Sequence, residues 1–250
     1  LATLPQALQP VRKIAPGIAD AQLYGGIDIP GTLATGRVVR AEGLLARPHT
    51  LMLTMAERCD AGLAARLAQA LDSESGHALI LLDEGAEPDE QAPAALRERV
   101  AFSLSLDGLR AVDLADIVLD AADIGAARAR LRSVQVPDRA LVQLCVTAAR
   151  FGIGSMRAPL LALAAARAHA ALDGRAALSD DDLTLAAQLV FAHRATQVPQ
   201  DPEDDAPEQP EPPEPETPDN TPDDAQSPDE DSTPALPDEM LIEAVRALLP

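Results

Sequence analysis

The sequence predicts an α/β portion, then an all-α portion and an acidic linker, and three observations support this order. Short apolar runs alternate with helical patterns over residues 1–108. Between residues 109 and 198 the pattern changes to helical stretches rich in Ala, Leu and Arg. Residues 199–239 contain 16 acidic residues and 12 prolines but no Lys or Arg, a composition that cannot bury enough apolar surface to fold.

Three apolar runs predict the sheet. Residues 50–55, Thr-Leu-Met-Leu-Thr-Met, are expected to form a buried strand, and a helical pattern follows from residue 59 to residue 71. Residues 78–82 are expected to form a second strand. Residues 100–106 are expected to form a third, after a helix that begins near Pro93. Strands that alternate with helices indicate a parallel sheet covered by helices.

The all-α portion is expected to be a helical bundle. Breaks between helices are predicted at Gly125, Pro137, residues 152–154 and Gly174. One helix start is well marked, because Ser179 precedes three consecutive aspartates. The Ser hydroxyl can cap the helix, and the carboxylates lie at the positive end of the helix dipole.

The acidity of the chain lies in the linker. The whole chain has a net charge of −20, whereas residues 1–198 contain 23 acidic and 19 basic residues. Repeated prolines favour extended segments and like charges repel, so residues 199–239 are expected to act as a long, partly stiff spacer. Residues 240–250 have helical spacing and are predicted to begin a helix that leads to a further C-terminal domain.

Composition also excludes several kinds of partner and site. Aromatic residues make up 2% of the chain, and with the net charge of −20 this argues against nucleic-acid binding. No apolar run approaches the roughly 18 residues of a membrane span, and no signal-like N-terminus is present. Four scattered histidines and two isolated cysteines predict no metal site. A cytoplasmic protein with reduced thiols is expected.

Of the motifs that bind and hydrolyse nucleotides, the sequence retains only parts. The sequence contains no G-x-x-x-x-G-K-[ST] motif, and its single lysine, Lys13, follows Val-Arg rather than a glycine loop. A strand that ends in two acids can hold Mg2+ with the first and polarise water with the second. Here the strand ends in Ala56 and Glu57, so only the second acid is present. Taken alone, Glu57 is more simply a solvated carboxylate at a helix start.

Two arginines, Arg99 and Arg157, lie at positions from which they could contact the phosphate of a nucleotide. Arg99 follows a predicted helix and directly precedes a predicted strand, a position from which a guanidinium can reach across a subunit boundary. Its fixed charge and planar fork suit the stabilisation of phosphate charge on a neighbour. Arg157 stands two residues before a proline at a helix start. For both, the simpler interpretation is an ordinary surface arginine.

These features occur in an order that resembles the AAA+ subunits of magnesium chelatase, and among them the D-subunit family. The resemblance rests on Leu-Tyr-Gly-Gly-Ile-Asp-Ile at residues 23–29 and Gly-Leu-Leu-Ala-Arg at residues 43–47. It continues through Leu-Arg-Glu-Arg-Val at residues 96–100 and Met-Arg-Ala at residues 156–158. It covers roughly residues 16–194, and the segment 43–46 is its most specific part.

The resemblance implies a degenerate AAA+ core over residues 1–108 whose N-terminal part is missing, a helical lid over residues 109–198, and the linker 199–239. The segment 240–250 would then lead to an integrin-like domain beyond this chain. In the D-subunit family the nucleotide motifs have decayed. This implies a platform that does not hydrolyse ATP, with ATP and Mg2+ used at the level of the complex and mainly on the ATPase I subunit.

The partners implied are the I subunit, which forms a ring, and the H subunit, which carries protoporphyrin IX. The complex would insert Mg2+ into the porphyrin during chlorophyll or bacteriochlorophyll biosynthesis. The resemblance makes Arg99 a trans-acting arginine finger, Arg157 a second sensor and Glu57 a remnant catalytic acid. Two alternatives stay open at this point, namely a subunit of another AAA+ complex (cobalt chelatase-like or MoxR-like) and an interaction scaffold independent of ATP.

Overall fold

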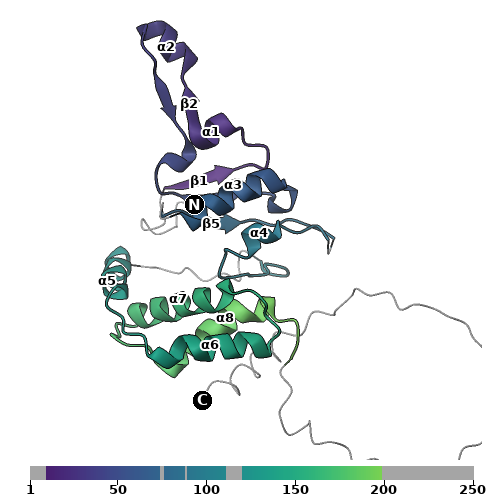
Figure 1. The fold of residues 1–250 in the computed structure, drawn as a ribbon, viewed down its shortest axis with the longest axis vertical. Helices are drawn as coiled ribbons and strands as arrows, with labels where there is room; N and C mark the ends of the chain where they lie inside the picture. Colours follow the sequence, from purple (N-terminus) through teal and green to yellow (C-terminus); the bar gives the residue numbers. More distant parts are fainter. Residues whose placement is uncertain (1–9, 74–75, 88, 111–119, 199–250) are drawn as a thin grey trace, which may run out of the picture.

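The computed structural model describes residues 10–73, 76–87, 89–110 and 120–198, and within them a small parallel sheet lies above a helical bundle in the view of Figure 1. Three strands, β1 (Val11–Ile14), β4 (Thr50–Leu53) and β5 (Ala78–Leu81), pair in the order β1-β4-β5, and both pairings are parallel. The predicted parallel sheet is confirmed, and so are its two strands near residues 50 and 78. The strand β1 was not predicted.

Helix α3 (Ala61–Asp72) joins β4 to β5 and packs on the sheet. The Asp60 carboxylate caps its first turn by accepting a hydrogen bond from the Leu63 amide at 2.9 Å. Leu63, Ala64, Leu67 and Ala68 recur at helical spacing on one face and are buried against the sheet residues Leu51 and Leu53. This confirms the helix predicted over residues 59–71.

An arm that the sequence analysis did not assign projects away from the sheet (Figure 1). After the short helix α1 (Asp20–Tyr24), strands β2 (Gly25–Ile27) and β3 (Arg40–Glu42) pair in antiparallel fashion. Helix α2 (Ile29–Thr35) closes the tip, capped by Asp28, and buries none of its residues. The chain then returns to β4 through a 3-10 turn, Leu44–Ala46.

At the base of the arm the two chain segments approach closely at glycines. A Cβ atom on Gly43 would lie 2.1 Å from the Tyr24 carbonyl carbon and 2.2 Å from the Gly25 nitrogen, and both contacts are with backbone. Gly25 itself has φ +83°, a left-handed conformation that favours glycine. The glycine of segment 43–46 is therefore required by this close approach.

We expect Gly43→Ala to lower the free energy of unfolding by about 2 kcal/mol, because the added methyl group must push two backbone segments apart. Urea unfolding followed by circular dichroism measures the change. Gly26→Ala is the matched control in the same arm, since a Cβ there meets no atom within 4 Å. Equal stabilities of the two variants would contradict the steric argument.

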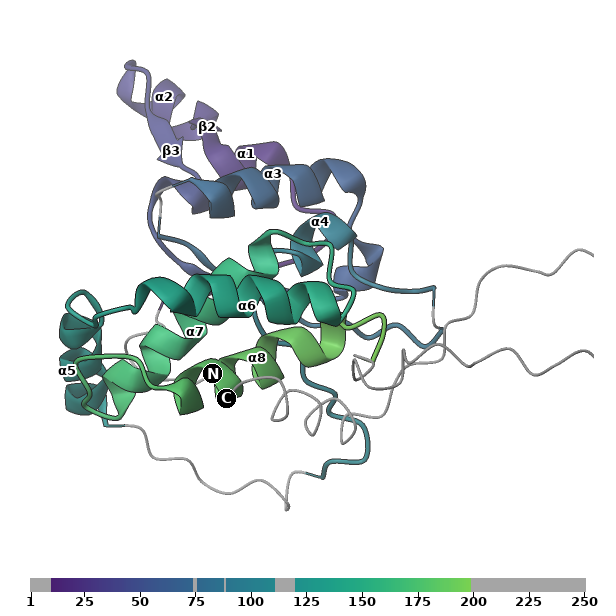
Figure 2. The ribbon, with the colours of Figure 1, turned by 60° about the horizontal axis from the view of Figure 1, so that its bottom comes forward.

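The C-terminal half of the described chain is a bundle of four helices: α5 (Ala121–Leu131), α6 (Asp138–Arg150), α7 (Arg157–Leu172) and α8 (Asp180–Phe191). Helices α6, α7 and α8 lie side by side, and α5 crosses one end of the bundle (Figure 2). A short 3-10 turn, Ala192–Arg194, follows α8. The predicted helical bundle is confirmed.

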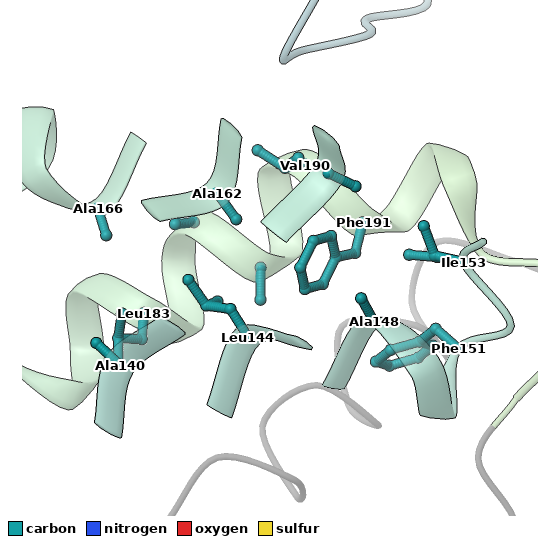
Figure 3. Close-up of a cluster of buried hydrophobic side chains, with 13 residues drawn as sticks. Ala140, Leu144, Ala148, Phe151, Ile153, Ala162, Ala166, Leu183, Val190 and Phe191 are labelled. Carbon is teal, nitrogen blue, oxygen red and sulfur yellow. The ribbon is translucent and has the colours of Figure 1, made fainter. Parts of the chain in front are cut away.

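The bundle core combines small and large side chains, and Figure 3 shows Phe151, Ile153 and Phe191 together at one end of it. Ala162 and Ala166 of α7 are fully buried, so their small side chains let the neighbouring helices approach. The break expected at Gly125 is wrong, because Gly125 lies inside α5. Glycine costs about 1 kcal/mol in a helix interior, and the packing of α5 against α7 offsets this cost.

The third predicted strand, residues 100–106, is also wrong. Helix α4 (Ala94–Arg97) begins after Pro93 as predicted, but the residues that follow it form no strand. Ala101 packs against the bundle instead, while Phe102 and Leu104 are 51% and 81% exposed. A strand needs a hydrogen-bonding neighbour, and within the described residues the segment pairs with none. The linker 199–239 and the segment 240–250 lie outside the described residues.

Candidate functional site

The parallel topology separates the predicted site residues between two edges of the sheet. Helix α3 starts after the carboxyl end of β4 and returns to the amino end of β5, so its last residue, Asp72, lies at the amino edge. Arg99, just after α4, reaches this edge and pairs with Asp72. Glu57 lies in the turn that follows β4, at the carboxyl edge.

Arg99 grips the Asp72 carboxylate with two nitrogens. Its Nε donates to Oδ1 at 3.0 Å and its Nη2 donates to Oδ2 at 2.5 Å. The third nitrogen, Nη1, donates to the Ala95 carbonyl at 2.7 Å. The Arg99 side chain is only 18% exposed, so most of the guanidinium is covered by these partners.

Arg157 grips the same carboxylate from the helical bundle. Its Nη1 donates to Asp72 Oδ1 at 3.0 Å and its Nη2 donates to Oδ2 at 3.1 Å. Arg157 is the first residue of α7 and lies 85 positions from Asp72 in the sequence. The two arginines chosen from the sequence are therefore brought together, through an acid that the sequence analysis did not single out.

A cavity of about 450 Å³ opens at this cluster. Its lining comes from the end of α3, the start of β5, the segment after α4 and the start of α7: Leu71, Asp72, His77, Ala78, Leu79, Glu98, Arg99, Val100, Ala101, Phe102, Arg157, Leu160 and Leu161. The hydrogen bonds from Arg99, and then those from Arg157, hold the pKa of Asp72 below its usual value. The carboxylate is thus ionised at neutral pH, and the cluster of two cations and one anion keeps one net positive charge.

Further contacts fix the sheet portion against the bundle beside the cluster. The Arg194 guanidinium donates to the carbonyls of Val100, at 2.5 Å, and Ala101, at 3.1 Å. The Ser155 hydroxyl donates to the Glu98 carboxylate. Because Glu98 adjoins Arg99 and Ser155 lies two residues before Arg157, these contacts hold the two arginines at a defined separation.

Glu57 has a different environment from the one expected. Its side chain is only 7% exposed, so it is not a solvated carboxylate. It accepts a hydrogen bond from the Glu84 amide at 3.1 Å and lies 3.4 Å from the Arg58 Nε. The residue ties the end of β4 to the segment after β5, and it does not line the cavity that contains Arg99 and Arg157.

The sequence carries one signal for Asp72, namely an acid at the end of a predicted helix. An acid in the last turn of a helix faces the negative end of the helix dipole, which is an unfavourable place for it. A cationic partner from elsewhere in the fold offsets this repulsion. Periodicity and spacing could not name that partner, because both arginines come from distant segments.

The cluster has the chemistry of an oxyanion site. Two guanidiniums that converge on one carboxylate present the planar forks that bind carboxylate or phosphate oxygens. Among the described residues no group of three or more His, Cys, Asp and Glu side chains gathers as metal ligands would. Among the described helices, none combines the length and the apolar character needed to cross a bilayer.

Comparisons with known proteins agree with this fold. Residues 142–216 match the family of AAA lid domains. A crystal structure from Cytophaga hutchinsonii, described as that of an ATPase, superposes with a TM-score of 0.53 at 14% identity. It covers 74% of this chain and 69% of that one, and it supports the fold alone.

Two curated relatives are similar over nearly the whole chain. The magnesium-chelatase 60 kDa subunit of Cereibacter sphaeroides is 50% identical over 241 residues, which is 96% of this chain and 42% of the relative. The magnesium-chelatase 60 kDa subunit of Rhodobacter capsulatus is 43% identical over 250 residues, which is 100% of this chain and 44% of the relative. The chain therefore spans less than half the length of either relative.

Proposed function

Because the chain is 50% and 43% identical to two magnesium-chelatase 60 kDa subunits, we propose that it belongs to their AAA+ family and is the platform part of such a subunit. In this proposal it assembles with the ATPase I subunit, and the assembly uses ATP to insert Mg2+ into protoporphyrin IX on the H subunit. The observation that carries the proposal is the identity of 50% and 43% over nearly the full chain.

The platform does not hydrolyse ATP in this proposal. Ala56 stands where a metal-holding acid would be needed, and an alanine cannot place Mg2+. The remaining acid, Glu57, is occupied by the Glu84 amide and lies at the opposite edge of the sheet from the arginines. ATP and Mg2+ would thus be bound mainly by the I subunit.

The arginine pair is the part of this chain that would act on the nucleotide. Arg99 and Arg157 both face the cavity at the amino edge of the sheet, and their forks fit the phosphate end of a nucleotide held by another chain. In that role Arg99 is an arginine finger acting in trans, and Arg157 is a sensor for the same phosphates. Two contacts to one phosphate group would make this chain sensitive to the nucleotide state of its neighbour.

The proposed domains are the AAA+ core over residues 1–108, the lid over residues 109–198, the linker 199–239 and a further helix from residue 240. The proposed location is the cytoplasm, and the two free thiols, Cys59 and Cys145, are compatible with a reducing compartment.

Nucleotide-dependent assembly tests the proposal. The complete natural polypeptide that contains this chain is mixed with purified magnesium-chelatase I subunit, and the size of the complex is followed by light scattering. We expect a ring-sized complex with ATP and Mg2+ and a smaller species without nucleotide. Equal association with and without nucleotide would instead favour a scaffold independent of ATP, and no association would contradict the choice of partner.

A further inference from the structure

We propose that Asp72 is a carboxylate latch, which holds Arg99 and Arg157 in a closed pair until a phosphate oxyanion on a neighbouring subunit takes its place. The inference rests on the proposed function, in which the two arginines act on a nucleotide in trans. It adds a regulatory residue to that site, since Asp72 occupies the arginine forks that the phosphate would need.

In the closed pair, Asp72 occupies one bidentate edge of each guanidinium. Each oxygen of the Asp72 carboxylate accepts one hydrogen bond from Arg99 and one from Arg157. Each of the three guanidinium nitrogens of Arg99 has a partner within the chain, the last of them being the Ala95 carbonyl. Arg99 can therefore offer its Nε and Nη2 edge to a phosphate as a bidentate fork only after it releases Asp72.

The position of Asp72 makes the latch exchangeable. Asp72 is the last residue of α3, where the negative end of the helix dipole repels a carboxylate. The attraction of the two arginines offsets this repulsion in the closed state. A competing anion that binds the arginines lets the carboxylate turn to solvent, and the Asp72 side chain is already 37% exposed.

The charges favour replacement of the Asp72 carboxylate by a phosphate group. Within the trio of Arg99, Arg157 and Asp72, one carboxylate neutralises one of the two guanidinium charges, so the trio keeps a net positive charge. The other acid of the cavity, Glu98, accepts a hydrogen bond from the Ser155 hydroxyl. The terminal phosphate of a nucleoside triphosphate has more than one negative charge and three oxygens, so it can satisfy both forks more fully than the carboxylate does. The cavity beside the cluster, of about 450 Å³, provides space for such a group. A single carboxylate from another protein would gain nothing over Asp72.

The test is Asp72→Asn in the complete natural polypeptide, assembled with the I subunit. Asparagine keeps the size of the side chain but removes the charge that competes with phosphate. We expect the ATP concentration for half-maximal turnover to fall about fivefold, the change that corresponds to releasing partly exposed ion pairs. Turnover at saturating ATP should stay within twofold of the wild type. Asp72→Glu, which keeps the charge, should retain a half-saturating concentration near that of the wild type.

Further variants separate the latch from the proposed function. In an Arg99→Ala background, Asp72→Asn should no longer lower the half-saturating ATP concentration by fivefold. If Arg99→Ala lowers turnover while Asp72→Asn changes nothing, the latch is wrong and the proposed function stands. If Asp72→Asn lowers maximal turnover as Arg99→Ala does, Asp72 positions the arginines and the latch is again wrong. If Arg99→Ala itself has no effect, the trans role fails.

Discussion

Arg99→Ala is expected to lower the ATP turnover of the assembled complex about 10³-fold, while the complex still forms. An arginine that reaches a neighbouring nucleotide stabilises the charge that develops on the transferred phosphoryl group, and such residues contribute 10³-fold or more to kcat. Arg99 lies on the cavity at the edge of the sheet rather than in the buried core, so its role is separable from folding. Steady-state ATPase assays at saturating ATP measure the effect.

The control is Arg139→Ala, which removes an arginine of the helical bundle. Arg139 is 65% exposed and pairs with Asp180 away from the cavity, so we expect turnover within twofold of the wild type. Arg99→Lys should give an intermediate loss, because lysine keeps the charge but lacks the planar fork. Unchanged turnover in Arg99→Ala, with assembly intact, would rule out the trans role.

Asp182→Asn is expected to lower the free energy of unfolding by roughly 3 kcal/mol at neutral pH, through the loss of a buried charge network. The Asp182 side chain is fully buried, and it accepts hydrogen bonds from the Ser179 amide at 2.8 Å and from the Ser179 hydroxyl at 2.9 Å. The Arg175 Nη2 and the His169 Nδ1 lie 2.5 Å and 2.6 Å from its Oδ1. An asparagine would turn an NH2 group toward these donors.

The same network predicts a pH dependence. Burial raises the pKa of Asp182, but hydrogen bonds from Arg175, Ser179 and His169 outweigh burial and hold the pKa well below its usual range. A carboxyl whose folded pKa is depressed contributes stability above its unfolded pKa, about 3.9, and loses it as the pH falls toward the folded value. The stability difference between Asp182→Asn and the wild type should therefore shrink below about pH 4.

Urea unfolding at pH 7 and at pH 3, followed by circular dichroism, measures both effects. Asp181→Asn is the matched control, because it removes an exposed acid from the same first turn of α8. It should cost at most about 1 kcal/mol, through the helix dipole alone. Equal losses in the two variants would mean that the network around Asp182 contributes no more than any acid at a helix start.

Much of the fold could be predicted because its signals are local. The apolar run that became β4, the helical spacing of α3 and the capping sequence after Ser179 each lie within a dozen residues. The Ser179 hydroxyl caps α8 as expected, and the Asp182 side chain completes a capping box. The third strand failed because alternation of apolar residues predicts a strand only when a neighbour pairs with it, and pairing is not a local property. The glycines at the base of the arm are likewise required by a contact between separate segments, which the local sequence does not reveal.

The candidate site divides in the same way. Motif order alone singled out Arg99 and Arg157, and residue type alone supplied their phosphate-binding chemistry. Only the tertiary structure decided that both converge on Asp72, at sequence separations of 27 and 85, and that Glu57 lies at the other edge of the sheet. Local sequence determines which backbone conformation a segment favours. The burial of apolar faces determines which segments meet, so the partner of a charged side chain is known only after the whole chain has packed.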